Sequence, residues 1–121
     1  MSISVVEAIG RHVVRALSDD LRKPKYRGDP NPLKGHCYVS TEALAHLLGW
    51  PESGVTPMNV RHEGDQHWFL RLPDGGFVDL TASQFHTPVP YGLARGRGFL
   101  TRCPSARAAE VIRRVKASFR M

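Results

Sequence analysis

A hairpin signal near the middle of the chain is the feature that most constrains its fold. The turn sequence PDGG at residues 73–76 separates two segments rich in aromatic and branched residues, 67–72 (HWFLRL) and 77–81 (FVDLT). A third segment of this kind, 58–62, precedes the turn residues Gly64-Asp65. The sequence therefore predicts a small antiparallel sheet built from three consecutive strands.

Segments with helical periodicity flank these strands. Apolar residues recur at three- and four-residue steps over 4–21, 37–48 and 105–119. Ser40 is an alternative N-cap for the second helix, and it would leave Cys37 three residues ahead of that helix. The Pro- and Gly-containing segments 22–35 and 87–98 predict long loops. Helices segregated from an antiparallel sheet indicate an α+β fold, with helices packed on a small sheet.

The composition is that of one ordinary globular domain, which we predict to span residues 1–121. Hydrophobic residues make up 41% of the chain and charged residues 23%. No apolar run approaches the roughly 20 residues that span a bilayer, and charged residues interrupt the N-terminal segment, unlike a signal peptide. We expect a cytoplasmic protein that does not bind membranes. Its two cysteines, Cys37 and Cys103, are then expected to be free thiols.

The formal net charge of +6 favours attraction to acidic partners. The arginines are spread along the chain, and no aromatic-interleaved basic motif is present. We therefore do not expect nucleic-acid binding as the main function. The oligomeric state stays open.

Cys37, His67 and Asp79 form an ordered trio that points to chemistry. A thiol at a helix N-terminus can be held as a thiolate, because the exposed N–H groups favour negative charge. His67, at the start of a strand, can act as base and acid, and Asp79, one strand later, can orient the imidazole. Backbone N–H groups near Cys37, together with the side chain of Asn31, could stabilise an oxyanion.

The hairpin geometry leaves the third member of this trio open. A tight turn around Asp74 predicts that residue 82 or 83 lies opposite His67. Asp79 would then lie about 10–13 Å away along the strand, too far for a hydrogen bond. In that register Gln84 or Ser83 is the better partner for His67, so Asp79 and Gln84 remain alternatives.

The segments GHCYVSTEAL (35–44), HWFLRLPDGGFVDLTASQF (67–85) and GFLTRCPSARA (98–108) resemble the small bacterial and phage YunG-like family. Their layout is also similar to the papain-like and transglutaminase-like (NlpC/P60-type) fold. There, a cysteine begins a helix, a histidine begins a strand and an Asp-x-Thr motif closes the next strand. The resemblance implies Cys37 as nucleophile, His67 as base and Asp79 as orienting residue.

From these residues we predict a cysteine-dependent amidohydrolase, meaning a peptidase, deamidase or acyl transferase, acting on a peptide, protein or small amide. His36, Tyr38 and Trp68 are expected to contact substrate, and Tyr91 in the long loop could meet a carboxylate. No zinc-ligand spacing is present, so we expect neither metal nor cofactor. The alternative is a non-catalytic binding module on the same fold that engages an acidic partner or nucleic acid through its basic surface.

Overall fold

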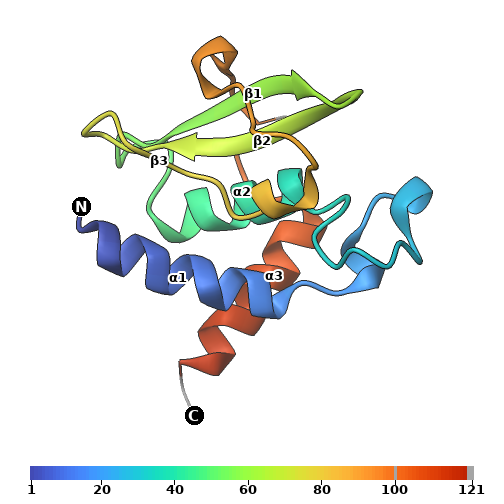
Figure 1. The fold of residues 1–121 in the computed structure, drawn as a ribbon. Coiled ribbons are helices and arrows are strands. Elements are labelled where there is room, and N and C mark those ends of the chain that lie inside the picture. Colours follow the sequence, from blue (N-terminus) through green and yellow to red (C-terminus); the bar gives the residue numbers. More distant parts are fainter. Residues whose placement is uncertain (100, 120–121) are drawn as a thin grey trace.

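Three helices lie on one side of a four-stranded antiparallel sheet (Figure 1). The computed structural model describes residues 1–99 and 101–119. The helices are α1 (Ile3–Ala16), α2 (Cys37–Leu47) and α3 (Ala106–Ser118). The strands are β1 (Thr56–His62), β2 (Asp65–Arg71), β3 (Phe77–Val78) and β4 (Arg95–Gly96), and their order in the sheet is β3-β2-β1-β4. The predicted α+β class is confirmed.

Two hairpins build most of the sheet. β1 and β2 meet at Glu63-Gly64, where both residues have positive φ, 49° and 83°, as a two-residue turn of the favoured hand requires. The second hairpin closes between Leu72 and Gly76, whose backbone groups are hydrogen-bonded across the PDG turn. The sequence missed β4, because this two-residue strand, which pairs with Met58 and Asn59, lies in a loop rich in Gly and Pro.

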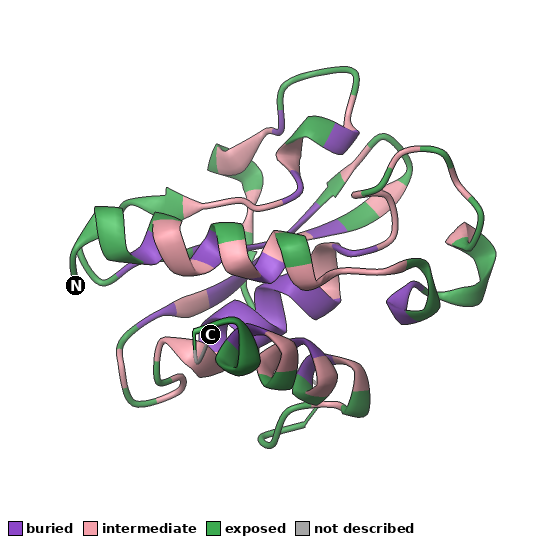
Figure 2. Cartoon of the chain, turned by 90° about the horizontal axis from the view of Figure 1, so that it is seen from below, coloured by how far each residue is buried: buried purple, intermediate pink, exposed green. Residues whose placement is uncertain are grey.

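Helix α2 is the centre of the main core. Its residues 39–45 are all buried between the sheet and the outer helices, as the purple ribbon in Figure 2 shows. Even Glu42 is fully buried, and its carboxylate accepts hydrogen bonds from the backbone N–H of Ser105 and from its hydroxyl, at 2.8 and 2.7 Å. A buried carboxylate therefore joins α2 to the start of α3. Apolar side chains of α1 and α3 complete the core: Val6, Val13, Ala108, Val111 and Val115.

The segment 85–94, rather than a helix, covers the other face of the sheet. Val89 packs there in a second cluster with Met58, Val60 and Phe69. The Glu63 carboxylate fixes the segment by accepting hydrogen bonds from the N–H groups of residues 86 and 87. The predicted surface loop is thus an ordered cover for this face.

Several element boundaries differ from the prediction. The first helix ends at Ala16, and a separate 3-10 turn follows at Asp19–Leu21. Ser40 is not the N-cap of α2, because it lies inside the helix and its hydroxyl donates to the carbonyl of Cys37. Strand β3 stops at Val78 instead of residue 81. Among the described residues, no helix has the length and hydropathy needed to cross a membrane.

Candidate active site

Cys37 is the first residue of α2, and its half-buried thiol is free. The preceding Gly35 has φ of +83°, a conformation that favours glycine. A Cβ on Gly35 would lie 2.6 Å from Cβ of Tyr26, so the Tyr26 ring packs directly on the backbone before the thiol. Only glycine allows both the turn into α2 and this close contact.

The loop before Cys37 is held by buried polar groups. The guanidinium of Arg22, which is 5% exposed, donates to the carbonyls of Tyr26, Asp29 and Asn31 at 2.9–3.0 Å. The two ring nitrogens of His36 lie 2.9 and 3.0 Å from the carbonyl oxygens of Pro32 and Ser18. These contacts fix the position at which α2 begins.

The start of α2 docks on β2. The Cys37 thiol donates to the carbonyl of Gln66 at 3.6 Å, and the Thr41 hydroxyl donates to the carbonyl of Trp68 at 3.1 Å. Alternate carbonyls of a strand point to the same edge, and the pairing of β2 with β3 ends at Leu70. The early part of β2 therefore has an edge at which the helix and its cysteine can lie.

His67 lies on β2 and is completely buried. Its Nε2 lies 2.6 Å from Oδ2 of Asp79, and the Tyr91 hydroxyl donates to the same oxygen at 2.9 Å. Oδ1 of Asp79 accepts from the backbone N–H of Thr81 at 3.2 Å. The carboxylate is thus held from two sides while it contacts the imidazole, and the structure brings two members of the predicted trio together.

The expectation that a tight turn moves Asp79 out of reach is wrong. The observed register pairs Leu70 with Val78, and its extension by one residue places Asp79 opposite Phe69. Since side chains two residues apart share a face of the sheet, His67 and Asp79 are diagonal neighbours, about 7–8 Å apart at Cα and within reach of long side chains. Gln84, the alternative, instead donates to the Thr81 hydroxyl.

The surroundings of His67 favour its charged form. Burial acts to lower its pKa, but the hydrogen bond to Asp79, the interaction with the Cys37 sulfur and the charges of both groups outweigh burial and raise the pKa to about 9. Burial and the charge of Asp79 also raise the pKa of Tyr91. Tyr91 therefore stays a neutral donor to the carboxylate.

The imidazole has one nitrogen left for the thiol. Nε2 is engaged by Asp79, whereas the buried Nδ1 has no hydrogen-bond partner within the part of the chain that the structure describes. The Cys37 sulfur is close enough to contribute to the raised pKa of His67. This arrangement can hold a thiolate beside an imidazolium and can move a proton between Nδ1 and a molecule bound at the sulfur.

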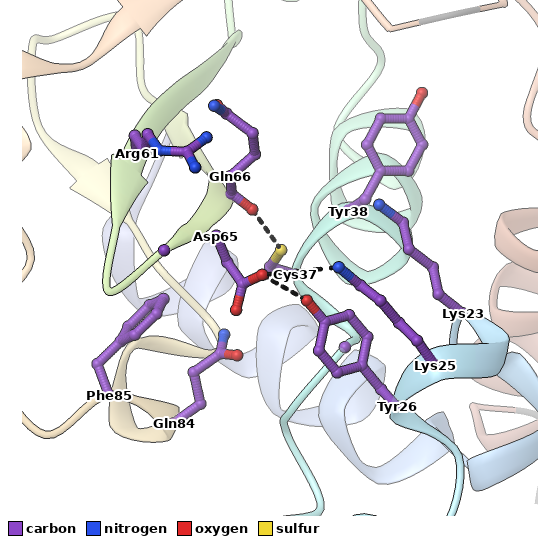
Figure 3. A pocket seen from close by; sticks show the side chains of 12 residues that line it. Lys23, Lys25, Tyr26, Cys37, Tyr38, Arg61, Asp65, Gln66, Gln84 and Phe85 are labelled. Carbon is purple, nitrogen blue, oxygen red and sulfur yellow. Dashed lines mark hydrogen bonds and ion pairs between the residues drawn. The ribbon is translucent and has the colours of Figure 1, made fainter.

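A pocket of about 230 Å³ opens beside the thiol (Figure 3). Its walls come from the loop before α2, the start of α2, the β1–β2 hairpin and the segment after β3. The lining residues are Lys23, Lys25, Tyr26, Gly35, Cys37, Tyr38, Arg61, Gly64, Asp65, Gln66, Gln84 and Phe85. A second hollow of about 350 Å³ shares three of them, Lys23, Gly35 and Tyr38, and continues toward the start of α3. The thiol thus lies in a groove with room for a substrate.

The structure places the other predicted site residues unevenly. Tyr38 and Gln84 line the pocket, as Figure 3 shows. Asn31 does not line it, and its side-chain oxygen accepts from the N–H of Leu33 within the loop. A donor role for Asn31 toward a substrate at the thiol is therefore not favoured.

His36 and Trp68 also lie outside the pocket lining. The His36 ring is 1% exposed and both of its nitrogens face carbonyl oxygens, so it positions the chain rather than meeting a substrate. Trp68 packs edge-on against Tyr38, with ring centroids 4.9 Å apart, and near Phe99 in the main core. Both residues therefore hold the residues of the site in place and do not face the pocket.

The YunG protein family model matches residues 6–116. The chain belongs to the YunG family. The match extends over all three helices and the whole sheet apart from a few terminal residues, and it includes Cys37, His67, Asp79 and Tyr91. No curated protein and no solved structure matches the chain. The family match confirms the resemblance to the YunG-like family seen in the sequence. It does not bear on the papain-like layout, so the chemistry of the site has to be argued from its geometry.

Sequence reasoning missed part of this site. Tyr26, Lys23 and Arg61 carry no motif, and only the folded loop and hairpin bring them to the thiol. Tyr91 does meet a carboxylate, as its place in the long loop suggested, but that carboxylate is Asp79 of the protein itself. The sequence did not show that residues 85–94 cover the sheet, and this cover is what brings Tyr91 to Asp79.

Proposed function

We propose that this YunG-family protein is a cysteine-dependent amidohydrolase or acyl transferase, with a papain-like or transglutaminase-like arrangement of its site. Cys37 is the nucleophile, His67 the proton carrier and Asp79 the orienting residue. The main support is the fully buried imidazole of His67, whose Nε2 lies 2.6 Å from Asp79 while Nδ1 has no hydrogen-bond partner in the described chain and the thiol is nearby. A histidine that only filled space would not need a buried carboxylate and a thiol beside it.

The reaction begins with attack of the Cys37 thiolate on an amide carbonyl carbon. A C–S bond forms and the carbonyl π electrons move onto the oxygen. When the tetrahedral intermediate collapses, the C–N bond breaks and the leaving amine takes the proton from Nδ1 of His67. A thioester on Cys37 remains.

The second half of the reaction regenerates the thiolate. Neutral His67 removes a proton from water, or from an acceptor amine, and the oxygen or nitrogen attacks the thioester carbon. The C–S bond then breaks and the thiolate leaves beside the imidazolium. Asp79 keeps the ring oriented through both steps and stabilises its charged form.

Two groups can supply donors to the oxyanion. The first N–H groups of an α-helix have no partner within the helix, and in α2 these belong to the residues that begin at Cys37. Gln84 lines the pocket, and its amide nitrogen uses one donor on Thr81 and has a second. We therefore assign Gln84, rather than Asn31, as the side-chain donor.

Alkylation by iodoacetamide at pH 6 tests the nucleophile, with Cys103 as an internal control because that thiol is exposed and unpaired. We expect Cys37 to react at least tenfold faster than Cys103, and His67→Ala to abolish this difference. Peptide mapping by mass spectrometry separates the two sites. If Cys37 reacts no faster than Cys103 in the intact protein, the Cys37 thiol is not activated, and this result favours the alternative of a non-catalytic binding module.

A further inference from the structure

The Cys37 pocket carries more positive than negative side chains. Lys23, Lys25 and Arg61 line it, and Asp65 is its one acidic lining residue. The Asp65 carboxylate accepts a hydrogen bond from the Tyr26 hydroxyl at 2.6 Å. Its oxygens also lie 3.8 Å from Nζ of Lys25 and 3.5 Å from Nζ of Lys34.

Asp65 is therefore already satisfied by the protein. The hydrogen bond from Tyr26 lowers its pKa most, and the charges of the two lysines add to this effect. A cationic substrate would have to displace two lysines to reach this carboxylate. The Asp65 carboxylate thus compensates the charges of the lysines that it contacts, and the positive charges of Lys23 and Arg61 in the pocket are not compensated.

The side chains of Lys23 and Arg61 have no hydrogen-bond or ion-pair partner among the residues that the structure describes. They come from separate elements: Lys23 lies in the loop before α2, and Arg61 lies near the end of β1. In Figure 3 they lie on opposite sides of Cys37. Two unpaired cations on facing walls leave a position between them where an anion is favoured.

We propose that this pocket selects amides that carry a carboxylate close to the scissile carbonyl, and that Lys23 and Arg61 hold this carboxylate. The guanidinium of Arg61 can donate to both carboxylate oxygens, while Lys23 contributes a mobile point charge from the other wall. The inference rests on the proposed function, because it names the substrate class of the same site. It makes Lys23 and Arg61 specificity residues rather than catalytic ones.

A matched pair of small electrophiles tests this selectivity without a known substrate. Iodoacetate and iodoacetamide both react by the same step: the thiolate forms a C–S bond, the C–I bond breaks and iodide leaves. They differ in that iodoacetate carries a carboxylate. The ratio of their rates at Cys37 therefore reports how strongly the pocket favours an anion, while the iodoacetamide rate alone reports the nucleophile.

We expect the double variant Lys23→Gln/Arg61→Gln to lower the iodoacetate-to-iodoacetamide rate ratio about fivefold at low salt, as two removed charges near the thiol would. A change in the thiolate fraction affects both reagents equally and therefore cancels in this ratio. The control variant Arg71→Gln/Arg102→Gln has the same net charge as the pocket variant. Gln66 lies beside the thiol, and Arg71 lies about 17 Å further along β2, away from the pocket. The control should keep the wild-type ratio, and added salt should lower the wild-type ratio toward that of the pocket variant.

The outcomes separate the two proposals. If Cys37 reacts rapidly with iodoacetamide but the pocket variant and the control have equal ratios, the selectivity is overturned and the nucleophile stands. If Cys37 reacts no faster than Cys103 with iodoacetamide, the proposed function is overturned and the substrate class falls with it. If Cys37 reacts faster than Cys103 and the iodoacetate-to-iodoacetamide rate ratio falls only in the pocket variant, the result supports both the proposed function and the proposed substrate class.

Discussion

Replacement of Asp79 by asparagine removes the group that keeps His67 charged. Asparagine has nearly the same shape and can still contact Nε2, so the ring is expected to stay in place. Burial acts to lower the pKa of His67, while the hydrogen bond to Asp79, the interaction with the Cys37 sulfur and the charges of both groups raise it to about 9. In Asp79→Asn the effects of burial and of Cys37 remain while those of the carboxylate are lost, and we expect the pKa of His67 to fall toward its ordinary value of 6.5.

The consequences can be worked out from these values. With a pKa of about 9, roughly 97% of His67 is imidazolium at pH 7.5, and with 6.5 only about 10% is. Since the pKa of His67 is raised in the folded state, its protonation stabilises the fold. This contribution to the free energy of unfolding is complete below about pH 6.5 and is lost as pH rises through about 9. Its size is about 3 kcal/mol. The stability advantage of the wild type over Asp79→Asn should therefore narrow by about this amount between pH 6.5 and 9.5.

Two measurements check this prediction. Nitrogen-15 NMR of the histidine side chains, with His67→Ala for assignment, gives the titration midpoint of His67 directly. Urea unfolding of both proteins at pH 6.5 and 9.5 gives the stability difference. If His67 of the wild type titrates near 6.5, or if Asp79→Asn leaves its midpoint near 9, the carboxylate does not control the imidazole and the reasoning is refuted.

Three further substitutions probe the surroundings of the site. Gly35→Ala should destabilise the protein by about 1–3 kcal/mol in urea unfolding, because Gly35 has φ of +83° and a Cβ would lie 2.6 Å from Tyr26; unchanged stability would contradict the close packing. Gln84→Ala should leave the alkylation rate of the thiol unchanged but lower kcat for ester or amide hydrolysis about 10²-fold, and equal kcat would exclude Gln84 as an oxyanion donor. Tyr91→Phe should cost about 1.5–3 kcal/mol of stability, since it removes a hydrogen bond to the charged Asp79, whereas a neutral effect would show that this bond is replaced by water.

The sequence predicted the elements that carry regular patterns. The three helices and the two hairpins follow from apolar periodicity and from turn residues, and Cys37 begins α2 as predicted. The 3-10 turn at Asp19–Leu21 ended the first helix earlier than its apolar repeat suggested. The two-residue strand β4 has too few residues to show a pattern.

Long-range placement was the part that the sequence could not supply. The register of the second hairpin decides whether Asp79 or Gln84 reaches His67, and a one- or two-residue difference in the turn changes the answer. The pocket lining depends on how the loop carrying Tyr26 folds over Gly35. Such contacts join residues far apart in the chain, and no local propensity encodes them.

The most direct test of the proposed chemistry is to trap an acyl group on Cys37. The protein is mixed with p-nitrophenyl acetate, quenched in acid and mapped by mass spectrometry, with hydroxylamine to cleave thioesters. We predict a hydroxylamine-sensitive acetyl group on Cys37 and not on Cys103, a burst of p-nitrophenol followed by steady turnover, and loss of that turnover in His67→Gln. Acetylation of Cys37 that is no greater than that of Cys103, with no turnover above the Cys37→Ala background, would contradict the account.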